Sequence, residues 1–171
     1  SSIYNENGKR LHESPVFEES IEVLDLENLN PLNQSVVTPM ATLHSALVSG
    51  IKDYFSKTGF KKAVLGLSGG IDSAVIACLA VEALGKEYVL CVAMPGQFSS
   101  SHSLGDAEYL AKNLGVELRV HSIKFINSTL LMEIKPSFQG LPSDVTEENI
   151  QSRLRGLILL ALSNKRNALL L

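Results

Sequence analysis

One short segment carries the residue types that most directly indicate chemistry: two adjacent glycines with hydroxyl and carboxylate side chains around them. After an apolar stretch the chain reads Leu65-Gly66-Leu67-Ser68-Gly69-Gly70-Ile71-Asp72-Ser73. Adjacent glycines allow a tight turn that brings backbone N–H groups close to an anion. If a helix begins directly after the turn, its N-terminus adds partial positive charge at the same point. The segment therefore predicts a phosphate-binding loop.

Asp72 and the two serines extend this prediction to a phosphate bound together with a metal ion. Ser68 and Ser73 offer hydroxyl donors, and a carboxylate beside phosphates is favourable when a divalent cation lies between them. Mg²⁺ commonly joins one or two carboxylates to substrate phosphates, so Asp72 is the predicted metal ligand. The segment lacks the Gly-Lys-Ser/Thr ending of a Walker loop, and its glycine spacing excludes a dinucleotide fingerprint. The alternative is a simple strand-to-helix turn with Asp72 and Ser73 in the first turn of the helix.

Two further polar stretches follow later in the chain. The first reads Met94-Pro95-Gly96-Gln97-Phe98-Ser99-Ser100-Ser101-His102-Ser103. Met94, at the expected end of a strand, is a candidate wall for an adenine ring. The serine-rich run 99–103 is either a loop that closes over phosphates or a flexible surface loop. His102 fits a phosphate contact and a helix-capping or solvent-exposed role equally well.

The second stretch runs from Asp144 to Gly156 and contains an asparagine and two arginines. Asn149 and Arg153 are four residues apart, so on a helix they share one face, whereas Arg155 points away from that line. From spacing alone, a solvated helix face explains these residues as well as a binding site does.

Alternating strand and helix patterns must position these stretches. Thr38, Ser103 and Thr146 are the predicted helix N-caps. We expect helices over 39–58, 71–84, 103–113, 124–134 and 146–164, and strands over 62–67, 88–94, 116–123 and 168–171. Such alternation predicts an α/β fold with a parallel sheet and helices on both faces. Ligands of such sheets bind outside the carboxyl ends of the strands.

The first residues follow a different pattern. Asn5-Glu6-Asn7-Gly8 predicts a hairpin turn, and the alternation over 21–26 predicts a further strand. We interpret 1–26 as a β-rich remnant, too small to be stable alone, followed by an Asn-rich linker over 27–37. Residues 38–171 are the expected α/β domain, incomplete at its C-terminus. Cys78, in a helix, and Cys91, in a strand, are both expected to be buried and unreactive.

Composition narrows the function classes. The chain has 171 residues, 45% of them hydrophobic and 19% charged, with a net charge of −3. This composition excludes intrinsic disorder, and the apolar runs are too short to predict a membrane span. Lys and Arg are scattered, which argues against a nucleic-acid partner. Two cysteines make neither a disulfide framework nor a zinc site, so a cytoplasmic setting is the default expectation.

The three stretches together resemble a known family. Ser68 to Ser73 looks like the pyrophosphate loop of the ATP pyrophosphatases, and over about residues 40–171 the chain resembles the long, glutamine-dependent NAD+ synthetases. The resemblance implies a Rossmann-like, three-layer adenine-nucleotide alpha-hydrolase fold, with residues 1–26 as the end of a nitrilase-like glutaminase domain. It implies ATP-dependent amidation of deamido-NAD to NAD+ through an adenylate, with ammonia from glutamine and release of AMP and pyrophosphate, by a homodimer or higher homo-oligomer.

The resemblance also implies roles for individual residues. It implies an ATP site at Gly66 to Ser73 with Met94, Mg²⁺ at Asp72, and deamido-NAD at Asn149 and more weakly at Arg153. It implies no protein nucleophile and no catalytic residue of this chain beyond the ATP loop. A Thr-Thr-Gly-Asn-Lys-Ser-Glu stretch of the family would follow Leu171, so the chain alone is expected to be inactive. Gly96 is a small departure from the family pattern.

Two alternatives stay open at this point. One is another ATP pyrophosphatase, either GMP synthetase-like or tRNA-modifying, and the other is a non-catalytic ATP-binding module on the same fold.

Overall fold

The computed structural model describes residues 1–30, 38–97 and 101–171, and the chain divides into two compact units, 1–53 and 54–171. Most of the predicted linker, 31–37, lies outside the described residues. So do Phe98, Ser99 and Ser100 of the serine-rich stretch. None of the helices in the described parts of the chain is long and apolar enough to cross a membrane.

The first unit contains the predicted hairpin. Strand β1 (Ser2–Tyr4) pairs antiparallel with β2 (Arg10–Glu13). The Asn5 side chain organises the turn, because its Oδ1 accepts hydrogen bonds from the backbone N–H groups of Asn7 and Lys9. Gly8 has φ +73°, which glycine adopts at little cost.

The predicted strand over 21–26 is wrong. Its alternating side chains Ile21 and Val23 are 100% and 99% exposed, and none of its residues pairs with a described strand. A short 3-10 helix, η1 (Leu26–Asn28), follows, with the Asp25 side chain accepting from the N–H of Glu27. A segment with an alternating pattern forms a strand only when another strand pairs with its backbone, and neither strand of the hairpin pairs with residues 21–26.

Helix α1 (Pro39–Thr58) begins and ends at the predicted residues. The Thr38 hydroxyl accepts a hydrogen bond from the N–H of Ala41, which confirms the predicted N-cap. At the other end Gly59 has φ +77° and its N–H bonds to the Phe55 carbonyl. The helix runs continuously through the boundary between the two units.

The second unit is built on a parallel sheet, as predicted. Its strand order is β5-β4-β3-β6. The strands are β3 (Ala63–Gly66), β4 (Val89–Ala93), β5 (Glu117–Val120) and β6 (Leu169–Leu170). Every residue of β4 is buried, as are the first three residues of β3. These two apolar strands form the centre of the sheet, so their carboxyl ends are held rigidly.

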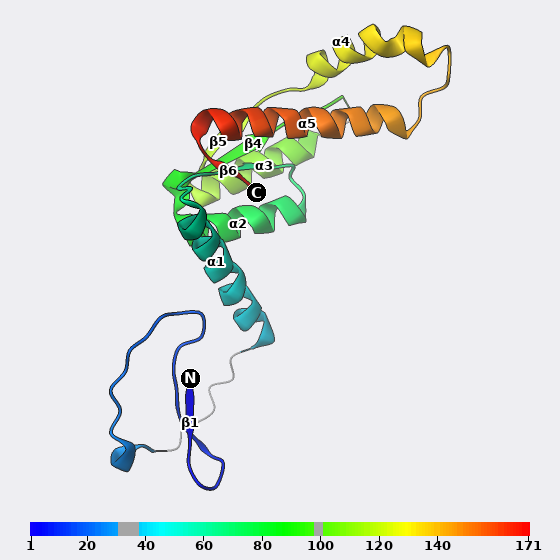
Figure 1. Ribbon diagram of the computed structural model, residues 1–171. Coiled ribbons are helices and arrows are strands. Elements are labelled where there is room, and N and C mark those ends of the chain that lie inside the picture. Colours follow the sequence, from blue (N-terminus) through cyan, green and yellow to red (C-terminus); the bar gives the residue numbers. More distant parts are fainter. Residues whose placement is uncertain (31–37, 98–100) are drawn as a thin grey trace. The chain divides into compact units, whose positions relative to one another are not determined.

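Helices cover both faces of this sheet. In Figure 1, α5 (Val145–Arg166) lies on one face and α2 (Ile71–Leu84) and α3 (Ser101–Leu114) on the other. Helix α4 (Lys124–Ile134) packs beside α5 and has the predicted bounds. Two 3-10 helices complete the unit, η2 (Lys86–Tyr88) and η3 (Lys135–Phe138). The α5 side of the core joins Val64, Leu90, Val92, Met94, Ile123 and Ala168 to Ile158, Leu159 and Leu162.

Two of the predicted N-caps are wrong. Helix α3 begins at Ser101, so Ser103 already lies in its first turn. Helix α5 is capped by Asp144 rather than Thr146: the Asp144 carboxylate accepts from the N–H of Thr146 at 2.8 Å, and Glu147 Oε2 accepts from the N–H of Asp144 at 2.9 Å. A charged acceptor makes the stronger cap. Hydrogen bonds from the Thr146 side chain and then from its N–H lower the pKa of Asp144, and the bond from the Asp144 N–H lowers the pKa of Glu147.

Helix α2 is only partly buried. Ala77 and Ala80 face the sheet, while Ile71 and Val75 are 75% and 47% exposed. Cys78 is exposed as well, so the prediction that it is buried is wrong. A helix that is apolar on all sides gives no sequence signal for which side faces the core.

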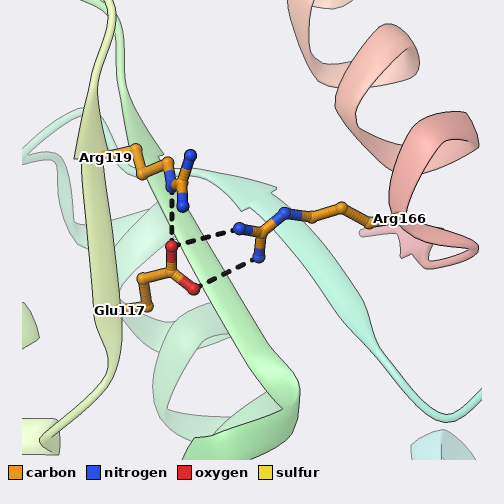
Figure 2. A network of polar contacts seen from close by, with 3 residues as sticks. All are labelled: Glu117, Arg119 and Arg166. Atoms are coloured by element: carbon orange, nitrogen blue, oxygen red, sulfur yellow. Dashed lines mark hydrogen bonds and ion pairs between the residues drawn. The ribbon is translucent and has the colours of Figure 1, made fainter.

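A salt-bridge network joins the outer strand to the end of α5 (Figure 2). Glu117 Oε1 accepts from Arg119 Nε at 2.6 Å, and the Arg166 guanidinium donates to both Glu117 oxygens at 3.2 Å. The hydrogen bonds from Arg166, and then those from Arg119, lower the pKa of Glu117. Arg166 lies in the last turn of α5, where its charge also favours the helix dipole.

The two cysteines should differ in reactivity. Cys91 is completely buried, and burial, with a smaller contribution from Cys78, raises the pKa of its thiol to about 11. In the folded chain at neutral pH we expect one thiol to react rapidly with a thiol reagent and the second only after unfolding. Cys78→Ser should remove the rapid phase. Loss of that phase in Cys91→Ser instead would contradict the assignment.

Substituting Glu117 by a neutral residue should lower the unfolding free energy only slightly, and only above acidic pH. A depressed folded-state pKa stabilises the fold above the unfolded-state pKa, and this stabilisation is lost as the pH falls through the folded-state pKa. Because the Glu117 side chain is 47% exposed, Glu117→Gln should lower the unfolding free energy at neutral pH by under about 1 kcal/mol. Urea unfolding at neutral and strongly acidic pH measures this difference. A larger difference in acid would be inconsistent with the network.

Candidate functional site

A cleft opens at the carboxyl ends of the two central strands, where parallel α/β sheets bind their ligands. Its volume is about 400 Å³. The lining residues come from the ends of β3 and β4, the first turn of α3 and the middle of α5: Gly66, Leu67, Ser68, Val92, Ala93, Met94, Pro95, Ser103, Leu104, Arg155 and Leu159. The cleft therefore brings together the first two polar stretches and one arginine of the third.

The glycine-rich loop connects β3 to α2, and its own hydroxyl groups fix its shape. Ser73 Oγ donates to the Gly70 carbonyl at 2.9 Å and lies 3.2 Å from the Ser68 N–H, which donates to it. Ser68 Oγ accepts from the N–H of Gly70 at 3.2 Å. The two serine hydroxyls also lie 3.1 Å apart. The loop is thus held in one conformation by bonds within itself, before any ligand contacts it.

Gly69 is required by a close approach of two backbones. Its φ is +80°, and a Cβ built there would lie 2.3 Å from the Ser103 carbonyl oxygen and 2.8 Å from the Ser103 Cα. The obstacle is backbone, so it cannot move aside as a flexible side chain could. The loop and the first turn of α3 therefore lie together only because residue 69 is a glycine.

The inner wall of the cleft is apolar. Leu67 and Met94 are buried against the ends of their strands, and Leu104 and Leu159 face the same space. Gly66 leaves part of this space open, since a Cβ there would lie 3.3 Å from Leu159 Cδ1 and 3.5 Å from Met94 Cε. With an apolar wall beside a predicted phosphate-binding loop, the cleft suits a ligand that has a flat aromatic ring attached to charged groups.

Among the residues that the structure describes, helix α5 supplies the one charged side chain lining the cleft. Arg155 is half-buried, and its Nε donates to the Met94 carbonyl at 3.2 Å. Asn149 and Arg153, the predicted substrate residues, are exposed and do not line it; Arg153 donates to the Asn149 carbonyl at 3.2 Å. No local sequence signal singles out Arg155, because Gln151 and Arg155 have the same four-residue spacing as Asn149 and Arg153. Only the burial of Gln151 in the folded chain distinguishes the two pairs.

Asp72 lies in the first turn of α2, beside the loop, with its side chain exposed. No hydrogen bond or ion pair of its carboxylate is found among the described residues. The described ranges also contain no group of three or more His, Cys, Asp or Glu side chains arranged to hold a metal. Asp72 alone therefore fits Mg²⁺ only where nucleotide phosphates supply further ligands, the arrangement Mg²⁺ prefers.

His102 is exposed in the first turn of α3 and does not line the cleft. Ser103, in contrast, lines it, and its backbone contacts the loop at Gly69.

Comparison with known proteins identifies a family. The NAD synthase family model matches residues 43–171. Glutamine-dependent NAD(+) synthetase of Synechocystis is 47% identical over all of this chain, which covers 32% of that protein. The enzyme of the same name from Aquifex aeolicus is 50% identical over 75% of this chain and 23% of its own length.

Solved structures agree. Glutamine-dependent NAD+ synthetase from Acinetobacter baumannii, in complex with ADP, superposes with a TM-score of 0.91 at 36% identity, covering 99% of this chain and 33% of its own. NH3-dependent NAD synthetase from Campylobacter jejuni gives 0.69 at 29% identity, covering 78% of this chain and 56% of its own. The chain spans about a third of the length of the curated relatives it matches.

Gly69→Ala should disrupt the loop far more than a glycine substitution with the same backbone conformation elsewhere. Gly140 is the matched control, because it has φ +79° and no atom within 4 Å of a built Cβ. Both variants carry the strain of a left-handed residue, about 1–2 kcal/mol, but only Gly69→Ala also meets the Ser103 backbone. Urea unfolding measures both. Equal losses of stability would mean that the close approach is unimportant.

Proposed function

The chain belongs to the NAD synthase family, and we propose from this premise that its cleft binds ATP for the amidation of deamido-NAD to NAD+. The proposal depends on one observation. The glycine loop at the N-terminus of α2 is held by hydrogen bonds within itself and opens onto an apolar cleft. The proposed ATP site consists of Gly66 to Ser73 together with Met94. The relative from Acinetobacter baumannii, which was solved with ADP, supports a nucleotide in this fold.

The proposed orientation of ATP follows from the two chemistries of the cleft. The phosphates lie on the N–H groups of the loop and in the field of the α2 N-terminus, which favours negative charge. The adenine ring lies against Leu67, Met94 and Leu159. Arg155 supplies positive charge at the cleft wall.

We propose that the reaction proceeds in two steps. The nicotinate carboxylate of deamido-NAD attacks the α-phosphate of ATP, which forms an adenylate and releases pyrophosphate. Ammonia from glutamine then attacks the adenylated carbonyl and releases AMP, giving NAD+. This chain supplies no nucleophile; its loop N–H groups orient the phosphates and stabilise the departing pyrophosphate. Asp72 is the residue that would hold Mg²⁺, which would neutralise part of the phosphate charge.

The deamido-NAD contacts are proposed at Asn149 and, more weakly, at Arg153. Both side chains are exposed on the N-terminal half of α5, and their four-residue spacing places them on one side of the helix. Because neither lines the cleft, they fit a second substrate better than they fit ATP.

The relatives also support a proposed context. We propose that residues 1–26 end a glutaminase domain, that 27–37 link it to the synthetase domain over 38–171, and that the complete reaction needs the further residues present in the longer relatives. The chain alone should therefore bind Mg·ATP without forming NAD+. A homo-oligomer and a cytoplasmic location, with no nucleic-acid or membrane partner, belong to the same proposal.

Asp72→Asn should weaken binding of ATP only when Mg²⁺ is present. Removing a carboxylate that shares a cation with the phosphates should lower Mg·ATP affinity by about tenfold, the equivalent of one charged hydrogen bond, while thermal stability barely changes. Isothermal titration with and without Mg²⁺ measures this. Glu87→Gln is the control, since it makes the same charge change at the opposite, amino edge of the sheet. Equal weakening by both variants would exclude a role for Asp72 in metal binding.

The substrate is tested in a longer protein that contains this chain together with the remaining two thirds of the relatives' length. We expect AMP release from ATP with deamido-NAD and ammonia or glutamine, and strong loss of it in Asp72→Asn. Release only with tRNA or XMP would point instead to another ATP pyrophosphatase. ATP binding without release under any of these conditions would point to a non-catalytic module.

A further inference from the structure

Gly96 and Gln151 lie against each other and beside Arg155, which lines the cleft, although they are 55 positions apart in the sequence. Gln151 is buried, with 7% of its surface exposed, and is one of three polar residues buried in the described chain. A Cβ built on Gly96 would lie 2.5 Å from Gln151 Oε1 and 3.0 Å from Arg155 Nη2. Residue 96 must therefore lack a side chain for Gln151 and Arg155 to occupy their places.

The segment just before Gly96 forms the end of the cleft wall and is held by three hydrogen bonds. The N–H of His121 donates to the Ala93 carbonyl at 2.9 Å, and the N–H of Ile123 donates to the Pro95 carbonyl at 3.1 Å. From α5, Arg155 donates to the Met94 carbonyl at 3.2 Å. The first two bonds join backbone to backbone, so only the third depends on where a side chain is placed.

The two glycines of the site differ in what a side chain would displace. At Gly69 the obstacle is the Ser103 backbone, whereas at Gly96 it is the ends of two side chains. A methyl group at residue 96 would leave the strands in place. It would overlap most with the Gln151 amide, which must shift, and the Arg155 guanidinium, which lies against the same point, would be displaced with it.

We propose that Gln151 is a positioning residue which, packed over Gly96, holds the Arg155 guanidinium against Met94 and toward the cleft. Gly96 and Gln151 then act as a matched pair, in which the missing side chain at one position makes room for the amide at the other. The consequence for nucleotide affinity rests on the proposed function, while the placement of Arg155 does not.

The experiment compares Gly96→Ala, Gln151→Ala and the double variant with the unchanged chain. Gly156→Ala is the matched control, because Gly156 follows Arg155 on α5 and no atom lies within 4 Å of a Cβ built there. Three quantities are measured: the thermal unfolding midpoint, hydrogen exchange of the Arg155 Nε–H by NMR, and Mg·ATP affinity by titration calorimetry.

We expect Gly96→Ala to fold, to lose the slow exchange of the Arg155 Nε–H, and to bind Mg·ATP about tenfold more weakly, as for loss of one charged hydrogen bond. In the double variant the space left by Gln151 accepts the methyl group, so slow exchange and most of the affinity return. Gln151→Ala alone should show a smaller loss of affinity, because Arg155 keeps its acceptor but loses its lateral packing. Gly156→Ala should leave exchange and affinity unchanged.

Three results would overturn the inference. The first is an unchanged exchange rate of the Arg155 Nε–H in Gly96→Ala. The second is that the effects of the two substitutions simply add in the double variant. The third is a lower unfolding midpoint in Gly96→Ala with unchanged Mg·ATP affinity. If the unchanged chain fails to bind Mg·ATP, the proposed function fails, and the exchange of the Arg155 Nε–H alone decides the placement of Gln151.

Discussion

The contact between the Gly69 turn and the Ser103 backbone is the constraint on which the candidate site depends. It brings the end of β3, the N-terminus of α2 and the first turn of α3 to one point, and a single β-carbon would prevent it. Because the central strands β3 and β4 are buried on both faces, their carboxyl ends cannot shift to relieve such a clash. Rigid strands and a turn that only glycine permits together give a preformed anion site, which lowers the entropic cost of binding a flexible polyphosphate.

Helix α5 positions site residues in a different way. It contacts the sheet both at the carboxyl ends and at the amino ends of the strands. Near its middle, Gln151, Arg155 and Leu159 follow one another at four-residue intervals and contact the cleft end of β4. At its C-terminus Arg166 bonds to Glu117 at the amino end of β5. The apolar contacts of Ile158 and Leu162 with the sheet lie between these points. The orientation of Arg155 is thus tied to the packing of the whole helix.

The sequence predicted the elements whose signals are local. The alternating pattern, the Thr38 cap and the bounds of α4 were confirmed because each depends on neighbouring residues. The strand over 21–26 was wrong because a strand needs a partner that local pattern cannot supply. Exposure of Cys78 was missed because α2 is apolar on every side. On α5 the pairs Asn149–Arg153 and Gln151–Arg155 have the same spacing, and only the packing of the helix decides which pair faces the sheet.

The most direct test is to map, by NMR, which backbone amides and arginine side-chain N–H groups of the labelled chain respond to Mg·ATP. If ATP occupies the cleft, the largest shifts lie at Gly66 to Ser73, with further shifts at Met94 and at the Arg155 side chain. Shifts confined to the amino ends of the strands, around Lys62 and Glu87, or no shifts at saturating Mg·ATP, would contradict an ATP site in the cleft.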